Sequence, residues 1–251
     1  TTSLRGLVDG VIVVDQQMEP VHSGLGGGVV PDAFMILSRI ISSFHNDKGE
    51  LLIKGLTPTE QDVFELSDEF VKSSLSSTGV NLFEMDSYSK RLWLEPALSI
   101  LAIDAPPVAE SVNLLIPKAK AKVSLRLPPT EDPDHAMNML EKHIKENTPF
   151  NANVEFIPEA KGKGILVDPK NEFSSKLIES FNKHWENEVA YMGVGGSIPF
   201  ANVFINEFPN SEIVLVGAGD EEGNAHAPNE SVNISDIQRL IDSLTDAISN
   251  Y

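Results

Sequence analysis

The cleanest pattern in this sequence is the strict alternation of polar and apolar side chains from Lys120 to Leu127. A period of two predicts a β-strand with one face in a core and the other face outside it. The β-branched run at 9–14 predicts a second strand, and the segments 99–105 and 153–157 predict two more. One-sided strands need an apolar layer on a single face, and this constrains the fold more than any other feature of the chain.

Two helices are predicted between these strands. One begins at Pro31-Asp32 and presents Phe34 and Leu37 on its apolar face; the other covers 133–146, with Asp132 as its cap. The segment 57–95 is polar, and we expect it to be a mostly helical insertion. The order β-α-insertion-β-β-α-β is the split pattern of a ferredoxin-like sandwich, which has two helices on one sheet face.

The character of the chain changes after Pro158. Helices are predicted at 172–186 and 235–249, with a glycine-rich loop at 193–199. The continuous apolar run 212–217 predicts a strand buried on both faces, as in a parallel α/β sheet. So few strands cannot close a core alone, and this part of the chain therefore requires strands from elsewhere.

Composition narrows the functional classes. The 251 residues carry a net charge of −18, which argues against a nucleic-acid partner, and no apolar run approaches the length of a membrane span. The absence of cysteine leaves His, Asp and Glu as the metal ligands to expect, and it is compatible with a cytoplasmic protein. The opening at Thr1 without Met leads us to expect numbering that starts inside a longer protein.

Two loops carry candidate functional residues. His226 follows the apolar run 212–217, where α/β proteins place ligand-binding groups, and Glu230 could orient its ring. The alternative is a capping histidine in an ordinary loop. In the loop 193–199, Gly195 and Gly196 allow backbone amides to approach an anion, and Ser197 adds a hydroxyl donor; the alternative is a simple turn.

Two further candidates lie nearer the N-terminus. His22 stands in a glycine-rich segment, either as an exposed functional side chain or as part of a hinge. Arg126 lies in an alternating strand, where its guanidinium could bind a carboxylate or could simply face solvent. The remaining histidines are expected at the surface without a role: His45, His135, His143 and His184.

The order of these motifs resembles the carnosinase-like dipeptidases, which belong with the aminoacylases, acetylornithine deacetylases and succinyl-diaminopimelate desuccinylases. The resemblance covers essentially the whole chain and rests on motifs in the following order: Leu4-Arg5-Gly6, His22-Ser23-Gly24, Ser124-Leu125-Arg126-Leu127, Gly195-Gly196-Ser197-Ile198-Pro199 and His226-Ala227-Pro228-Asn229-Glu230. The stretch Leu92-Trp93-Leu94-Glu95-Pro96 is similar to the dipeptidase branch in particular.

This resemblance implies a lid domain that also forms a homodimer, inserted into an α/β catalytic domain with two metal ions. Residues 8–157 would be the lid, and 1–7 with 158–251 the C-terminal part of the catalytic domain. By the same resemblance His226 is a metal ligand, His22 polarises the scissile carbonyl of the partner subunit's substrate, and Arg126 binds the substrate's C-terminal carboxylate. Gly195, Gly196 and Ser197 contact that same end.

The resemblance further implies a hydrolase of dipeptides or small peptides that uses two divalent ions, zinc with manganese or cobalt as alternatives. Val194 departs from it, since many relatives have Glu before the Gly-Gly-Ser motif. The other metal motifs of the family have no counterpart in this chain, which supplies at most one ligand and is expected to be inactive alone. Two other functions remain open: an N-acyl amino acid deacylase, and a dimerisation module without catalysis.

Overall fold

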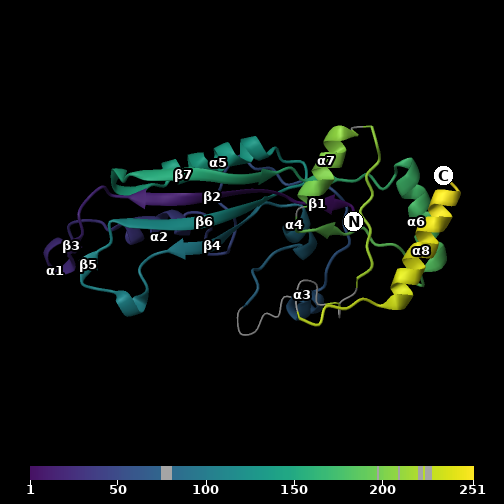
Figure 1. Ribbon diagram of the computed structural model, residues 1–251, viewed down its shortest axis with the longest axis horizontal. Helices are drawn as coiled ribbons and strands as arrows, with labels where there is room; N and C mark the ends of the chain where they lie inside the picture. Colours follow the sequence, from purple (N-terminus) through teal and green to yellow (C-terminus); the bar gives the residue numbers. More distant parts are fainter. Residues whose placement is uncertain (75–80, 197, 209, 220–222, 224–227) are drawn as a thin grey trace.

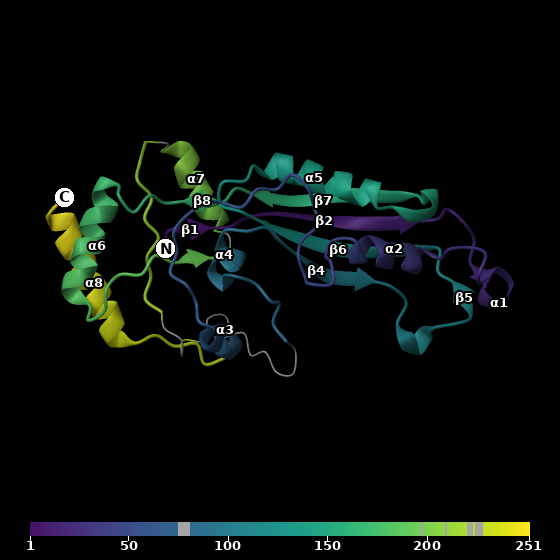
Figure 2. The ribbon, with the colours of Figure 1, turned by 180° about the vertical axis from the view of Figure 1, so that it is seen from behind.

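The computed structural model describes residues 1–74, 81–196, 198–208, 210–219, 223 and 228–251. It is an elongated mixed α/β molecule (Figure 1). A four-stranded sheet with its helices forms one end, and the C-terminal helices form the other (Figure 2). No helix in the described part of the chain combines the length and apolar character needed to cross a membrane.

The larger sheet is antiparallel, and its strand order is β4-β6-β2-β7. The strands are β2 (Gly6–Asp15), β4 (Ala97–Asp104), β6 (Lys118–Leu127) and β7 (Val154–Gly162). The four predicted strands are therefore confirmed, and each of them extends beyond its predicted bounds at one end or both. This order is the one expected of a β-α-β-β-α-β sandwich.

One face of this sheet is covered by α2 (Ala33–Ser42) and α5 (Pro133–Glu146). Asp32 and Asp132 cap these helices, as their carboxylates accept hydrogen bonds from Met35 N and His135 N, both at 2.9 Å. The alternation in the strands sends every second residue into a single core: Val8, Ile12 and Val14 from β2, Val123 and Leu125 from β6, Ile36 and Ile40 from α2, Leu140 and Ile144 from α5. Phe34, predicted on the apolar face of α2, is instead 40% exposed.

The expectation that His143 lies at the surface is wrong. It belongs to α5, is 8% exposed, and stacks on Phe44, just beyond the end of α2, with ring centroids 5.2 Å apart. Its Nε2 is 3.1 Å from the carbonyl oxygen of Ser43. An imidazole has enough apolar surface to pack in this position once a backbone acceptor satisfies its N–H group.

Short elements extend from the sheet at the end far from the N-terminus (Figures 1 and 2). They are β3 (Val21–His22), α1 (Ser23–Gly26), the 3-10 turn η1 (Val108–Glu110) and β5 (Leu114–Leu115), with β3 paired to β5. A second 3-10 turn, η2 (Pro149–Asn151), precedes β7.

The segment 57–95 is not mostly helical. Its described helices are α3 (Asp68–Ser74) and α4 (Tyr88–Trp93), and the rest of its described residues lack regular structure. The segment nevertheless has a small core of its own, formed by Leu66, Val71, Trp93 and Leu94. A buried hydrogen bond of 2.8 Å from Leu66 N to Ser89 Oγ replaces the helical pairing there.

A second, three-stranded sheet has the order β8-β1-β9. Its strands are β1 (Ser3–Leu4), β8 (Ile165–Leu166) and β9 (Gly193–Val194). Along the chain, α6 (Glu172–His184) lies between β8 and β9, and α7 (Pro199–Glu207) and α8 (Ile234–Ser249) follow β9. The helices α6 and α8 pack together, and Ser180 Oγ donates to the carbonyl oxygen of Ser243 at 2.8 Å.

The prediction of a strand at 212–217 is wrong. These residues form no regular ladder and are only partly buried, although the Thr1 amino group donates to Leu215 O at 3.2 Å. A strand exists only where a neighbouring strand pairs with its backbone. The apolar run alone therefore could not ensure that a strand forms here.

Candidate functional site

Arg126 lies near the end of β6 on the sheet face opposite the helices. It pairs across the sheet with Leu7 of β2 and with Ala97 of β4, while its sequence neighbours Leu125 and Leu127 are fully buried under the helices. The pleat thus turns Arg126 away from the core. Its side chain is half-buried at the end of the sheet nearest the N-terminus.

Arg5 joins this end of the sheet to the glycine-rich loop. Leu4 pairs with Val194, Arg5 N donates to Val194 O at 3.3 Å, and Arg5 Nε donates to Gly195 O at 3.2 Å. The Arg5 side chain is only 8% exposed. A guanidinium is therefore held against the loop that was predicted to bind an anion.

The pKa of Arg5 reflects the positive charges of two neighbouring arginines, Arg126 and Arg91. Burial, followed by the positive charges of Arg126 and Arg91, lowers the pKa of Arg5 to about 10. Arg91 is itself paired with Glu95, at 3.0 Å between Nη1 and Oε2. Arg5 and Arg126 thus create a positive region in a chain whose net charge is −18.

Close packing explains the glycines of this loop. A Cβ at Gly193 would lie 2.5 Å from the Cβ of Trp93, and a Cβ at Gly195 would lie 3.0 Å from Arg5 Nη2 and 3.2 Å from Leu92 O. At Gly196 the nearest atom would be 3.9 Å away. Gly193 and Gly195 let the loop approach α4 and Arg5, whereas Gly196 has open space beside it.

His22 lies far from these residues. Arg126 pairs with Leu7 and Lys118 pairs with Asp15, so β6 separates the two ends by eight residue steps, about 26 Å. The short strand β3, which ends at His22, lies beyond the far end of the sheet (Figure 1). His22 is exposed, and its Nδ1 accepts a hydrogen bond of 3.0 Å from Gly24 N. In the neutral ring the proton is then on Nε2, which leaves that nitrogen as a donor.

Two predicted site residues, Ser197 and His226, lie outside the described residues. Within the described ranges, no group of three or more His, Asp or Glu side chains could hold a metal ion. The donor groups of the described residues therefore do not fit a two-metal centre. The residues that the structure does bring together are Arg5, Arg126 and Gly195.

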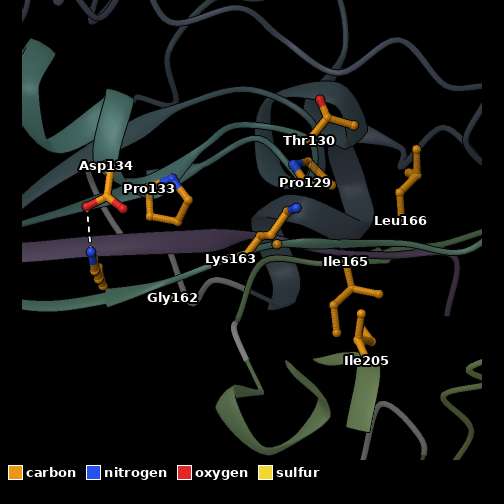
Figure 3. Close-up of a pocket in the computed structure, with 11 residues that line it drawn as sticks. Pro129, Thr130, Pro133, Asp134, Gly162, Lys163, Ile165, Leu166 and Ile205 are labelled. Atoms are coloured by element: carbon orange, nitrogen blue, oxygen red, sulfur yellow. Dashed lines mark hydrogen bonds and ion pairs between the residues drawn. The ribbon is translucent and has the colours of Figure 1, made fainter. Parts of the chain in front are cut away.

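A cavity of about 630 Å³ lies elsewhere, where the two sheets meet (Figure 3). Pro129, Ile165 and Ile205 line it, and an ion pair between Lys161 and Asp134 lies at its wall. None of the residues that the sequence predicted for a site lines this cavity. We therefore place the candidate site at the arginines and not at the cavity.

Sequence reasoning from single motifs missed Arg5 as a site residue. The available signal was a cation directly before a β-branched strand in an acidic chain, within the Leu4-Arg5-Gly6 motif. It could not show that Arg5 reaches Gly195, because that contact joins residues 190 positions apart.

The sequence model of the peptidase dimerisation domain of M20 peptidases matches residues 2–152. This chain therefore belongs to the M20 peptidase dimerisation domain family. The match covers the strands β2, β4 and β6 of the larger sheet together with α2 and α5, and it ends just before β7.

Named relatives extend the similarity beyond that domain. The cysteinylglycine-S-conjugate dipeptidase of Corynebacterium striatum is 30% identical over 96% of this chain and 54% of its own length. The Cys-Gly metallodipeptidase DUG1 of Saccharomyces cerevisiae is 26% identical over 94% of this chain and 52% of its own length. The chain thus spans about half the length of the curated relatives it matches.

Solved structures share the fold. The dipeptidase Dug1p from Saccharomyces cerevisiae superposes with a TM-score of 0.78 at 22% identity, over 99% of this chain and 55% of its own. Human carnosine dipeptidase 1 superposes with a TM-score of 0.77 at 18% identity, over 100% of this chain and 56% of its own.

Proposed function

We propose that the protein carrying this sequence is a metal-dependent dipeptidase that hydrolyses the amide bond of dipeptides or small peptides. The observation that carries the proposal is the position of Arg5, which donates to Gly195 O and lies close enough to Arg126, at the same end of the sheet, for the two charges to interact. A positive, partly buried site beside the backbone N–H groups of a glycine loop suits the free carboxylate at the end of a short peptide. The dipeptidase names of the relatives support the same substrate class.

Each candidate residue would have a separate role in binding or hydrolysis. The Arg126 guanidinium binds the C-terminal carboxylate, and the backbone N–H groups of Gly195 and Gly196 with the Ser197 hydroxyl contact the same end. The Nε2–H group of His22 donates a hydrogen bond to the carbonyl oxygen that becomes negative during hydrolysis. The hydrogen bond from Gly24 N to Nδ1 supports this role, since it leaves the proton on Nε2.

The metal requirement follows from relatives that are named metallodipeptidases. We propose two divalent ions, zinc in the first place and manganese or cobalt as alternatives, with His226 as one ligand. Bound ions of this kind activate water and polarise a carbonyl. We further propose a cytoplasmic location for the protein.

We propose that residues 8–157 act as a lid and dimerisation domain, and that 1–7 with 158–251 belong to the catalytic domain. A homodimer through the lid would bring His22 to the partner subunit's site, which fits the separation of His22 and Arg126 within one chain. The exposed edge strand β4 offers an interface, because Leu101 is 56% exposed and Ile103 49% exposed.

A second candidate is an N-acyl amino acid deacylase. Val194 favours it, since an exposed valine offers no charge to a free substrate amine. The third reading, a module without catalysis, is decided by the reading frame upstream of Thr1. If that frame encodes neither a His-x-Asp motif nor a Glu-Glu pair, the catalytic proposal is withdrawn.

The test uses the protein expressed with its upstream frame and loaded with zinc, manganese or cobalt in turn. Free dipeptides such as alanylglycine and β-alanylhistidine are compared with N-acetyl and N-succinyl amino acids. We expect release of amino acids from the dipeptides and at least tenfold lower kcat/KM for the N-acyl compounds. Turnover confined to N-acyl substrates would establish the deacylase instead, and no turnover of either set contradicts both proposals.

A further inference from the structure

We propose that Arg5 is a second carboxylate-binding guanidinium, which acts with Arg126 and holds the Gly195 loop in place. This inference rests on the proposed function for the identity of the substrate. It goes beyond the resemblance, which assigns the carboxylate to Arg126 and to the glycine loop alone.

The first argument is the state of the Arg5 side chain. It is 8% exposed, and only its Nε has a described acceptor, Gly195 O at 3.2 Å. Nη1 is buried and has no hydrogen-bond partner among the residues that the structure describes, and no carboxylate in those residues pairs with Arg5. A buried cation without a counter-charge is costly, so such a group is expected to meet an anion in the working protein.

The second argument is the charge around Arg5. The side chains that act on it are both cations, Arg126 and Arg91, and the Arg91 charge is offset by Glu95. The positive charges of Arg5 and Arg126 therefore repel each other. One carboxylate between them would relieve this repulsion and satisfy Nη1 in the same step.

The third argument is the spacing. Arg5 directly precedes β2, and Arg126 lies opposite Leu7, two residues further along. Backbones at this diagonal position are about 7–8 Å apart. Two long side chains that start so close can converge on a single carboxylate. The hydrogen bond from Arg5 Nε to Gly195 O holds the glycine loop beside the Arg5 guanidinium.

A binding experiment on the 251-residue chain tests the site without relying on turnover. The chain is labelled with ¹⁵N-arginine and titrated with sodium acetate, with sodium chloride at equal ionic strength as the comparison, and Arg5→Lys assigns the signals. We expect saturable shifts of the Arg5 Nε and Nη signals with acetate and none with chloride. Equal shifts with the two salts, or no shift at all, would overturn the proposal.

A kinetic experiment on the active protein then separates binding from positioning. Alanylglycine and alanylglycine amide are compared as substrates for the wild type and for Arg5→Gln. Because a hydrogen bond to a charged group contributes about 1.5–3 kcal/mol, KM for the free acid should rise about ten- to a hundredfold. The KM for the amide and both kcat values should change less than about threefold.

Arg91→Gln is the matched control, since it removes a nearby guanidinium that already has Glu95 as its partner. We expect its acid-to-amide preference to stay within about twofold of wild type. Should Arg5→Gln fail to fold, Arg5→Lys replaces it and is expected to retain part of the preference, because the charge remains. An equal loss for acid and amide would show that Arg5 only supports the loop, and would refute the inference.

The two proposals fail in different ways. If no dipeptide is hydrolysed but acetate shifts the Arg5 signals, the dipeptidase proposal falls and the carboxylate site stands. If dipeptides are hydrolysed with an acid-to-amide preference that does not depend on Arg5, the site falls and the dipeptidase proposal stands.

Discussion

His143 is a buried polar residue whose needs are met inside the fold. Its ring stacks on Phe44, and its Nε2 lies 3.1 Å from both the hydroxyl and the carbonyl oxygens of Ser43. Because the Ser43 hydroxyl donates to Ile40 O at 2.7 Å, its oxygen is free to accept from the imidazole. Burial lowers the pKa of His143 below its usual value, and this effect outweighs the opposite influence of the Ser43 carbonyl and of Glu146.

This shift predicts a pH dependence of stability. Above about pH 6.5, the unfolded value, both states hold a neutral ring and the shift has no effect. As the pH falls below that value, the unfolded state binds the proton more readily, so the free energy of unfolding decreases by at most about 1.4 kcal/mol per pH unit. Urea unfolding between pH 7.5 and 5.5 should show a shallower decrease for His143→Gln than for the wild type. Parallel slopes would contradict the assignment.

Arg5 differs from His143, because its buried Nη1 has no hydrogen-bond partner among the described residues. It also shows why the sequence predicted only part of the site. Arg126 and the Gly195-Gly196 pair are recognisable from an alternating strand and from local composition. The role of Arg5 depends on a contact with Gly195 and on burial, neither of which leaves a periodic trace in the sequence. The buried position of His143 escaped prediction for the same reason.

At the scale of elements, the two sheets are joined by two adjacent crossings. In the first crossing only Arg5 separates β1 from Gly6, the first residue of β2; in the second, Gly164 lies between β7 and β8. A Cβ at Gly6 would be 2.7 Å from Gly162 O, and a Cβ at Gly164 would be 2.6 Å from Pro129 Cα and Pro129 O. At both crossings one backbone therefore packs against another. A Cβ added at Gly6 or Gly164 would clash with backbone atoms, and a rotamer change of a neighbouring side chain could not relieve that clash.

Gly164→Ala should therefore destabilise the chain by about 1–3 kcal/mol, as overpacking does at rigid positions. The matched control is Gly217→Ala, because no atom lies within 4 Å of a Cβ built there. Its effect should stay within about 0.5 kcal/mol. Urea denaturation midpoints of the two variants and the wild type are the measurement, and equal midpoints would mean that the crossing relaxes freely.

The edge strand β4 carries a prediction about assembly. Leu101 and Ile103 are exposed apolar residues on a strand with one unpaired side in the described sheet. If the protein dimerises through this edge, Leu101→Lys with Ile103→Lys should weaken the dimer at least about tenfold, since two charges would be buried without partners. Sedimentation velocity at several concentrations measures this. Ile248→Lys, at a 65% exposed apolar position on α8, is the control and should leave association unchanged.

The sequence predicted those strands and helices correctly whose apolar face packs into the core of the larger sheet. The alternation of β6 and the caps at Asp32 and Asp132 are of this kind. The run 212–217 is not, because its apolar residues indicate burial but do not supply the neighbouring strand that a ladder requires. The segment 57–95 also packs without the regular structure that its composition suggested.

At the scale of the molecule, the candidate residues are divided between its two regions. β5, whose partner strand β3 carries His22, lies beyond the far end of the larger sheet (Figure 2), while Arg126, Arg5 and Gly195 lie at its opposite end. The sheet between them is rigid and about 26 Å long over the paired residues. A reaction that uses both His22 and Arg126 therefore requires His22 from a second subunit.

Mixing two impaired variants and assaying them at a substrate concentration well below KM tests this requirement. His22→Ala should lower kcat about 10²- to 10³-fold by removing one donor to the developing oxyanion, and Arg126→Ala should raise KM through loss of the carboxylate contact. In a mixed dimer, one site combines an intact Arg126 with the partner subunit's intact histidine, while the other site lacks both. Random exchange makes half of the dimers mixed, so activity should recover to about a quarter of the wild-type value. Metal content and unfolding midpoints of both variants should match the wild type. A mixture that stays as inactive as its components would place His22 and Arg126 in unrelated roles.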